Sequence, residues 1–394
     1  MKKIKISILS QISIVHLVSH IHMMVLPALM PLISTTTDLS FVDVGFAIAV
    51  FNVVSALVQL PVGFMVDKFG PAKVLLAGLL LGSVSFISLF FFSHYYWLVV
   101  AMAMAGLANA VYHPADYAIL SRSITDKKMG RAFSVHTFSG FVGTAITPFL
   151  VLFLAKSINI ETAYFVAGLI GLIAAIVILP TALKPALPAA VSVRPVVERK
   201  KALLSPTIFL LVVLFLLLSL SMTSIQYFSV SALVTGYGIV LNQANTALTA
   251  FLIACAVGVL FGGHLADKTQ RHGLIAAIAL IVTAILAASV ATSSFCALSL
   301  IFILAIMGFL SGMIMPSRDM LVRAASPKGA EGRVFGIVST GFNLGGIIGP
   351  LLFAWIIEGG HARGIFLSAA LFMVLTAIIA VYQEWQGAKT HKIA

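Results

Sequence analysis

The sequence predicts an all-α integral membrane protein in which twelve transmembrane helices form two pseudo-symmetric six-helix bundles. The first observation is composition: of 394 residues, 61% are hydrophobic and 9% are charged, whereas soluble proteins carry roughly 25% charged residues. A soluble globule could not hide that much apolar surface from water, so a soluble domain of appreciable size is excluded. The second observation is a series of twelve long apolar runs, and the third is a repeat of the first half in the second.

Each apolar run approaches or exceeds the roughly 20 residues that a membrane-spanning helix needs. Charged residues, glycines or prolines separate the runs. The predicted spans are residues 7–33, 40–66, 72–93, 96–121, 131–156, 162–183, 205–235, 242–265, 273–293, 296–325, 333–357 and 363–383. The first run is too long for the core of a signal peptide, so we expect it to be retained as a span. Cys255 and Cys296 form no CxxC motif, so the sequence predicts neither a disulfide framework nor a metal site.

The basic residues predict the orientation of these spans. Lys and Arg concentrate in cytoplasmic loops of membrane proteins. If the N-terminus is cytoplasmic, 22 of the 24 Lys and Arg residues fall on the cytoplasmic side, and only Lys156 and Arg363 fall outside. We therefore expect a multi-pass protein of a bacterial-type inner membrane with both termini in the cytoplasm. The net charge of +12 is then a consequence of topology, and a nucleic-acid partner is not expected.

The longest polar interruption divides the chain into two halves. Residues 184–204 contain three prolines and a charged cluster, Glu198 to Lys201. We expect an N-terminal bundle over residues 1–183, a cytoplasmic linker over 184–204, and a C-terminal bundle over 205–394.

The two halves share motifs at a constant offset. A shift of 202 residues superimposes Pro114 on Pro316 and Gly143 on Gly345, and the same shift superimposes the Gly-Arg pair ending at Arg131 on the pair ending at Arg333. Because each half contains an even number of spans, the two copies are parallel and related by an axis along the membrane normal. This arrangement is typical of secondary transporters that bind their solute between two bundles.

Residues 63–73 read GFMVDKFGPAK, and residues 263–271 read GHLADKTQR, a degraded copy that lacks the second glycine. The first segment resembles the loop signature between spans two and three of the major facilitator superfamily. The resemblance extends over the whole chain in span number, halves and both loops. Three stretches resemble the fosmidomycin-resistance type of exporter: His16 with the Pro-rich residues 26–31, the Tyr112-His113-Pro114 turn, and the Gly-rich fifth span.

Ionisable side chains inside predicted spans are the main candidates for function, because they are costly in lipid. His16 and His20 are four residues apart and share one helical face, whereas His22 points away from His20. The resemblance implies that spans one, four, seven and ten line a central cavity, so these groups could converge there. The candidate residues for a substrate and proton cavity are His16, His20, His113, Asp116, His136, Gln226, Ser229 and Asn343.

Three interpretations of the histidines remain open. They could carry protons, since imidazole titrates near neutral pH. They could contact substrate directly, including a metal chelate. They could also be hydrogen-bonded side chains packed between helices, and for His22 this structural role is favoured. No HExxH motif or paired cysteine is present, so no resident metal is expected.

A second group of residues is expected to control conformation. A carboxylate is stabilised at a helix N-terminus, and the resemblance implies that Asp67 and Asp267 each face a helix start in the opposite half. Asp116 aligns with Arg318 in the repeat, which suggests a cytoplasmic latch, although Arg318 could instead pair with Asp319. The candidate conformational residues are Gly63, Asp67, Lys68, Gly70, Lys73, Arg131, Asp267, Arg318 and Arg333.

The sequence thus predicts a secondary transporter that exports a small organic solute by alternating access, coupled to protons. Uptake of an organic acid or metal chelate is the alternative, and a non-transporting membrane sensor is a third possibility. There is no GxxxxGK[ST] motif for nucleotide and no nucleophile–base pair for an enzyme. The expected partners are a small-molecule substrate and the lipid bilayer. We expect no cofactor beyond the proton gradient, and function as a monomer.

Overall fold

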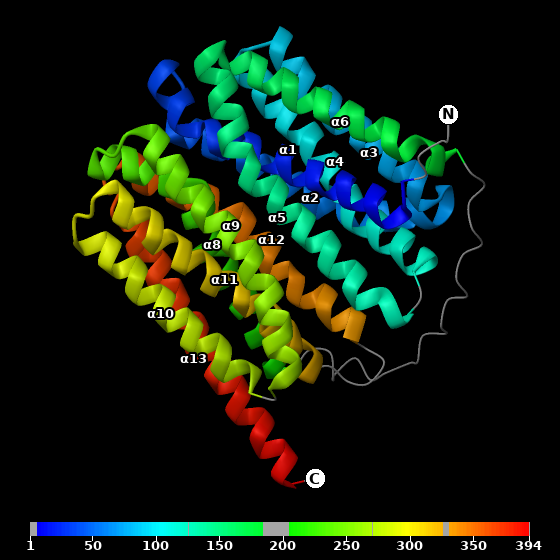
Figure 1. Cartoon of the computed structure of the whole chain (residues 1–394), viewed down its shortest axis with the longest axis vertical. Coiled ribbons are helices and arrows are strands. Elements are labelled where there is room, and N and C mark those ends of the chain that lie inside the picture. The colour runs from blue at the N-terminus through cyan, green and yellow to red at the C-terminus, as the bar shows by residue number, and fades with distance from the viewer. Residues whose placement is uncertain (1–5, 125, 184–204, 270, 326–330, 394) are drawn as a thin grey trace. The chain divides into compact units, whose positions relative to one another are not determined.

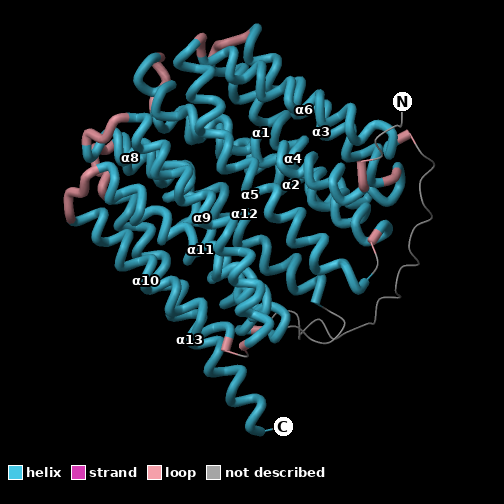
Figure 2. The backbone as a smooth tube through the Cα atoms, viewed as in Figure 1, coloured by secondary structure: helices cyan, strands magenta, loops and turns pink. Residues whose placement is uncertain are grey.

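The computed structural model describes residues 6–124, 126–183, 205–269, 271–325 and 331–393. Within these residues the chain is built of twelve long helices joined by short loops, without a strand (Figure 2). All twelve are long and apolar enough to cross a membrane, which confirms the predicted fold class. The helices are α1 Ile8–Thr36, α2 Phe41–Phe69, α3 Pro71–Phe91, α4 Tyr95–Ser123, α5 Asp126–Ser157, α6 Ile160–Ala182, α8 Pro206–Tyr237, α9 Leu241–Lys268, α10 His272–Thr292, α11 Ala297–Ala325, α12 Glu331–Glu358 and α13 Gly364–Ile393.

Several helices extend beyond the predicted spans. Helix α5 starts at Asp126 instead of residue 131, and α13 continues to Ile393 instead of residue 383. Figure 1 shows α13 running past the end of α10. Hydropathy marks where the apolar segment ends, whereas a helix continues for as long as its backbone hydrogen bonds can form. The polar turns at both places therefore belong to the helices but were outside the predicted spans.

Local capping explains where several helices begin and end. Ser40 and Asp43 form a capping box at the start of α2, in which each side chain bonds the other residue's backbone N–H. The chain then turns at Gly70, which ends α2 and precedes Pro71, the first residue of α3. Gly70 has a φ of 90°, a conformation that other residues rarely adopt. The second glycine of the predicted loop signature, Gly70, is therefore required by the turn itself.

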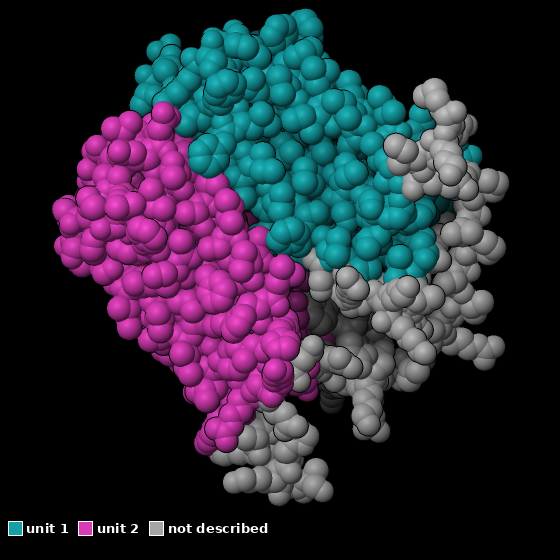
Figure 3. Space-filling model, viewed as in Figure 1, with its two compact units in different colours: residues 1–193 teal, residues 194–394 magenta. Residues whose placement is uncertain are grey.

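The chain divides into two compact units, residues 1–193 and 194–394 (Figure 3). The predicted linker, residues 184–204, lies outside the described residues. In the first unit the tightest helix pairs are α1 with α5, α2 with α4, and α3 with α6. In the second unit they are α8 with α12, α9 with α11, and α10 with α13. Each pair of the first unit thus has its repeat equivalent in the second.

The repeat extends to individual glycines at the helix crossings. A Cβ at Gly106 of α4 would collide with the carbonyl oxygen of Phe51 in α2, and a Cβ at Gly308 of α11 would collide with that of Phe251 in α9. Small residues at such crossings let two helix backbones approach closely, which is how transmembrane helices gain packing energy. The repeated motifs therefore encode the same close crossing in both units.

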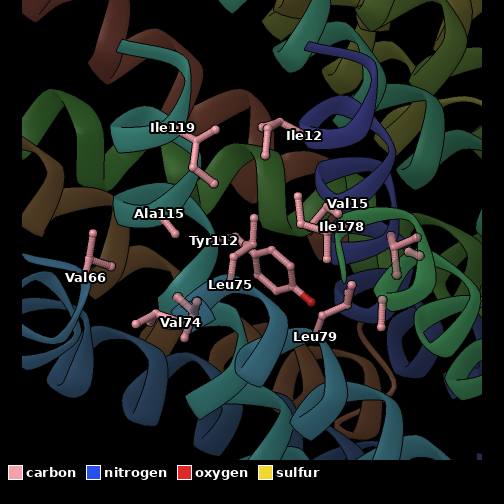
Figure 4. Close-up of a cluster of buried hydrophobic side chains, with 14 of the residues drawn as sticks. Ile12, Val15, Val66, Val74, Leu75, Leu79, Tyr112, Ala115, Ile119 and Ile178 are labelled. Carbon is pink, nitrogen blue, oxygen red and sulfur yellow. The ribbon is translucent and has the colours of Figure 1, made fainter. Parts of the chain in front are cut away.

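The core of the first unit surrounds Tyr112 of α4. Its ring lies among aliphatic side chains from α1, α2, α3 and α6, including Val15, Leu75 and Ile178 (Figure 4). The Tyr112 hydroxyl has no hydrogen-bond partner among the described residues. The side chain next to His113 therefore packs into the core and leaves the neighbouring histidine on another face of α4.

Candidate functional site

Helices α1, α4 and α5 bring together five of the predicted cavity residues. We call them the histidine–aspartate cluster: His16, His20, His113, Asp116 and His136. Helix α1 packs closely on α5 because Gly143 lies directly against the carbonyl oxygen of Leu17, where a Cβ could not fit. This close approach places the histidines of α1 beside those of α5, while α4 contributes the carboxylate.

Asp116 is the centre of the cluster. Its side chain is 0% exposed, and no other Asp or Glu among the described side chains is classed as buried. Its Oδ2 atom lies 3.0 Å from Nε2 of His136 and 3.5 Å from Nδ1 of His16. Because an ionised carboxylate only accepts hydrogen bonds, the Nε2–H group of His136 donates to Asp116. A carboxylate buried in this way is costly unless it is paired and hydrogen-bonded.

Two buried atoms of the cluster lack hydrogen-bond partners. Oδ1 of Asp116 and Nδ1 of His16 are both without one among the described residues. Such atoms are rare in proteins and call for an explanation. Oδ1 of the Asp116 carboxylate can accept a proton. Nδ1 of His16, which lies 3.5 Å from Oδ2, can accept one in the Nε2–H tautomer of that ring.

The imidazole rings pack directly on one another. The ring of His16 stacks on that of His136 with centroids 3.7 Å apart, and it meets the ring of His20 edge-on at 4.7 Å. His113 lies 5.6 Å from His16 and is exposed, unlike His16 and His136. Like charges at these separations repel strongly in a medium of low dielectric constant. The cluster is therefore suited to hold one added positive charge at a time.

His20 is anchored by α5 on the other side of the cluster. Its Nδ1 atom lies 2.8 Å from the Oγ1 atom of Thr144. Gly140, one turn before Thr144, leaves room for the Nε2 edges of both His16 and His20. Thr144 and Gly140 were not among the residues predicted from the sequence. Residues 136, 140 and 144 are spaced four apart and so lie on one helical face, but this spacing alone does not single out a threonine or a glycine.

His22 belongs to a separate, structural environment. Its Nε2–H group donates to the backbone oxygen of Ala167 in α6 at 3.0 Å. Gly82 of α3 and Gly171 of α6 leave the space that its ring fills. The predicted structural role of His22 therefore agrees with its position between α1, α3 and α6.

Three members of the cluster could be considered as metal ligands. His16, Asp116 and His136 each offer a ligand atom, and these atoms all lie within 4.8 Å of one another. A metal ion binds an imidazole nitrogen along its lone pair, in the plane of the ring. The His16 and His136 rings are stacked with an angle of 23° between their planes, so these lone pairs do not converge on one point. The arrangement fits hydrogen bonding better than ion binding, and the absence of a resident metal stays a prediction.

The other three predicted cavity residues lie in the second unit. Ser229 of α8 is buried and its hydroxyl has no partner among the described residues. Gln226 of α8 and Asn343 of α12 are half-buried. Several other hydroxyl groups of α8 bond to backbone oxygens: Ser219 donates to Phe342, and Ser221 donates to Leu218. Much of the polar character of α8 is thus used within the unit, as is common for Ser and Thr in helices.

Arg318 of α11 forms an ion pair with its neighbour. Its Nη2 and Nε atoms lie 2.7 Å and 2.9 Å from Oδ1 of Asp319. Its guanidinium also lies over the rings of Phe215 and Phe342, at 4.7 Å and 5.3 Å from their centroids. The ion pair with Asp319 is the alternative to the predicted latch between Arg318 and Asp116. Because Asp116 is bonded to His136, a latch between Asp116 and Arg318 would require both residues to leave their present partners, and it stays a prediction.

The structure describes some of the predicted conformational residues and leaves the side chains of others undescribed. A Cβ at Gly63 would meet nothing within 4 Å, whereas Gly70 is required by its positive φ. Lys68 and Lys73 are exposed, and the Lys68 Nζ atom lies 5.2 Å from the Phe69 ring centroid. Four side chains lie outside the described part of the structure, so their predicted contacts stay predictions: Asp67, Arg131, Asp267 and Arg333.

Two repeated six-helix units in one membrane protein are the architecture of many secondary transporters. The chain is a member of the Major Facilitator Superfamily, whose family model matches residues 12–242 and 212–391. The sequence-based family assignment is therefore confirmed.

Two relatives and one solved structure illustrate the similarity. The chain is 26% identical to the fosmidomycin resistance protein of Escherichia coli K12 over 277 residues, which cover 68% of this chain and 67% of the relative. It is 25% identical to the multi-drug resistance efflux pump PmrA of Streptococcus pneumoniae over 353 residues, 86% and 85% of the two chains. A bacterial homologue of the human lysosomal transporter Spinster, in an inward-facing and occupied conformation, superimposes with a TM-score of 0.79 at 12% identity, covering 97% and 96%.

Proposed function

We propose that this protein exports small organic solutes across the inner membrane by exchanging them for protons. Its membership of the Major Facilitator Superfamily supports transport, and the names of its relatives, which include a fosmidomycin resistance protein and an efflux pump, support export. The proposed orientation has both termini in the cytoplasm, with the proton gradient as the driving force. The solutes that we propose are small antimicrobial compounds, with fosmidomycin as the first to test.

One observation carries the proposal of proton coupling. Asp116 is a fully buried carboxylate in a membrane-spanning helix, and its Oδ1 atom and the neighbouring His16 Nδ1 atom have no hydrogen-bond partner among the described residues. A proton added at Oδ1 would neutralise the carboxylate, and a proton added at His16 Nδ1 would create an ion pair with Asp116. Either event changes the charge of the bundle interior. Intramembrane ionisable groups of this kind commonly mark proton pathways.

Protonation would influence transport by favouring one conformation over another. A carrier that alternates between two states responds to any change that stabilises one of them, and about 1.4 kcal/mol corresponds to a tenfold population shift. The charge-assisted bond between His136 and Asp116 is of that magnitude. We propose that protonation and deprotonation of Asp116 change the strength of this bond and so shift the balance between the two conformations.

The test uses purified protein in proteoliposomes that contain the pH indicator pyranine. Fosmidomycin applied on one side should drive protons in the opposite direction in the wild type. Asp116→Asn keeps an oxygen acceptor for His136 but cannot ionise, so proton movement should cease while exchange of fosmidomycin across the membrane continues. Asp38→Asn, which alters an exposed carboxylate in the loop before α2, is the matched control. Normal proton movement in Asp116→Asn would show that Asp116 is not the proton carrier.

A further inference from the structure

The hydroxyl group of Thr144 contacts both the backbone of its own helix and the imidazole ring of His20. The Thr144 Oγ1 atom lies 3.2 Å from the backbone oxygen of Gly140 and 2.8 Å from Nδ1 of His20. A hydroxyl has a single hydrogen, and a backbone carbonyl can only accept. When Thr144 donates to Gly140, it must accept from His20. In this arrangement His20 is the Nδ1–H tautomer, and its Nε2 atom is the unprotonated nitrogen.

Gly140 controls the space around that free nitrogen. A Cβ at position 140 would lie 2.7 Å from Nε2 of His20 and 2.8 Å from Nε2 of His16. Real Cβ atoms do not come this close to other heavy atoms, so an alanine would push both rings away. Glycine therefore lets two histidines of α1 present their Nε2 edges to the same place on α5.

We infer that Thr144 and Gly140 are positioning residues, which hold His20 as the Nδ1–H tautomer. Nε2 of His20 then serves as a second proton acceptor, in addition to Asp116. The part of this inference that concerns proton transport rests on the proposed function, whereas the tautomer does not. In the proposed step, a proton binds the Nε2 lone pair to give an imidazolium, and the Nδ1–H group stays bonded to Thr144. Release returns the same proton from Nε2. The tautomer is thus preserved through the cycle.

The surroundings of His20 limit how many protons the site can hold. The titratable groups that face it are His16 on its own helix, His113 on α4 and His136 on α5. A positive charge on any of these rings opposes a second one nearby. His20 can therefore accept a proton only when its neighbours are neutral, which couples it to the state of Asp116 and His136.

A purely structural role for Thr144 would predict a different outcome. If the Thr144–His20 bond only held α1 against α5, the choice of tautomer would have no consequence for proton uptake. The neighbouring Thr147 provides the comparison, since it is also buried in α5 and its hydroxyl donates to its own helix, at the oxygen of Gly143. Substituting either threonine by valine removes one hydroxyl and keeps the shape.

The decisive measurement is nitrogen NMR of protein with ¹⁵N-labelled histidine in lipid bilayers, with the His20 signals identified by their loss in His20→Ala. The wild type should show the Nδ1–H tautomer at high pH. Thr144→Val should shift the tautomer ratio toward Nε2–H by about three- to tenfold, which is the effect expected of one net hydrogen bond. Thr144→Ser should restore the wild-type signal, and Thr147→Val should leave it unchanged. A wild-type His20 in the Nε2–H form would overturn the inference, whether or not the variants fold.

A second measurement addresses proton uptake. The pH at which the His20 signals change from neutral imidazole to imidazolium should move in Thr144→Val and in Gly140→Ala, and it should not move in Thr147→Val. Gly82→Ala is the control for the glycine, because it faces the structural His22. Unchanged His20 protonation in both Thr144→Val and Gly140→Ala would overturn the positioning role. If these NMR results hold but the pyranine assay finds no proton movement with solute, the proposed function fails and the tautomer assignment stands.

Discussion

At the scale of single residues, two histidines of α1 that are separated by one residue have different environments. His20 faces α5 and the histidine–aspartate cluster. His22 faces α3 and α6, and its Nε2–H group donates to the backbone oxygen of Ala167. Residues two apart on a helix point in nearly opposite directions, so neighbouring positions in the sequence can serve unrelated purposes.

We predict that His22→Ala lowers the free energy of unfolding by about 1–3 kcal/mol, because it leaves a cavity and removes a buried hydrogen bond. Proton coupling should be retained, since His22 does not contact the cluster. Thermal unfolding in detergent measures the first effect and the pyranine assay the second. His361→Ala, at an exposed loop position, should change stability by less than about 0.5 kcal/mol. Loss of coupling in a stably folded His22→Ala protein would contradict this assignment.

The members of the cluster could be identified from sequence because ionisable residues are rare in apolar spans. His16, Asp116 and His136 are conspicuous for that reason. Thr144 could not be singled out in the same way, because threonine is common in membrane helices and usually bonds its own backbone. Only the packing of α1 on α5 shows that its hydroxyl also contacts His20. Gly140 was hidden similarly, since a glycine acquires a role only from the atoms that fill its space.

At the scale of helices, the sequence repeat appears as equivalent close helix crossings in the two units. Gly106 lets α4 approach α2, and Gly308 lets α11 approach α9 at the equivalent position. The sequence predicted which segments are helices and that the halves correspond. It did not predict which helices are tightly paired, because apolar side chains face both lipid and protein and hydropathy does not distinguish the two.

We predict that Gly106→Ala and Gly308→Ala each destabilise the protein by about 1–3 kcal/mol, since a methyl group would be forced against a backbone carbonyl. Gly63→Ala is the matched control, because a Cβ at Gly63 meets nothing within 4 Å. A helical alanine is also favoured over glycine, so this control should be neutral or slightly stabilising. Unfolding temperatures of the three variants in one detergent provide the measurement. Equal stability of Gly106→Ala and Gly63→Ala would show that the crossing is not close.

At the scale of the whole molecule, the count of helices decides how charge is distributed across the membrane. The structure has twelve candidate spans among its described residues. With this number, an inside N-terminus places 22 of the 24 Lys and Arg residues on the cytoplasmic side. Omitting any single span would reverse the side of every later loop and mix the two classes. The span count and the charge distribution therefore support one another, although they come from independent features of the sequence.

The last prediction concerns this topology. Reporter tags at Ala394 and within residues 186–197 should be found in the cytoplasm, and a tag near Gly359 should be found outside, because basic residues stay on the cytoplasmic side during insertion. Accessibility to a membrane-impermeant reagent in intact cells and in lysed cells separates the two sides. The site near Gly359 controls for access, since it should react in both samples. A tag within 186–197 that reacts in intact cells while the Ala394 tag does not would mean that an odd number of spans lies between them. The parallel repeat of two six-span bundles would then be impossible.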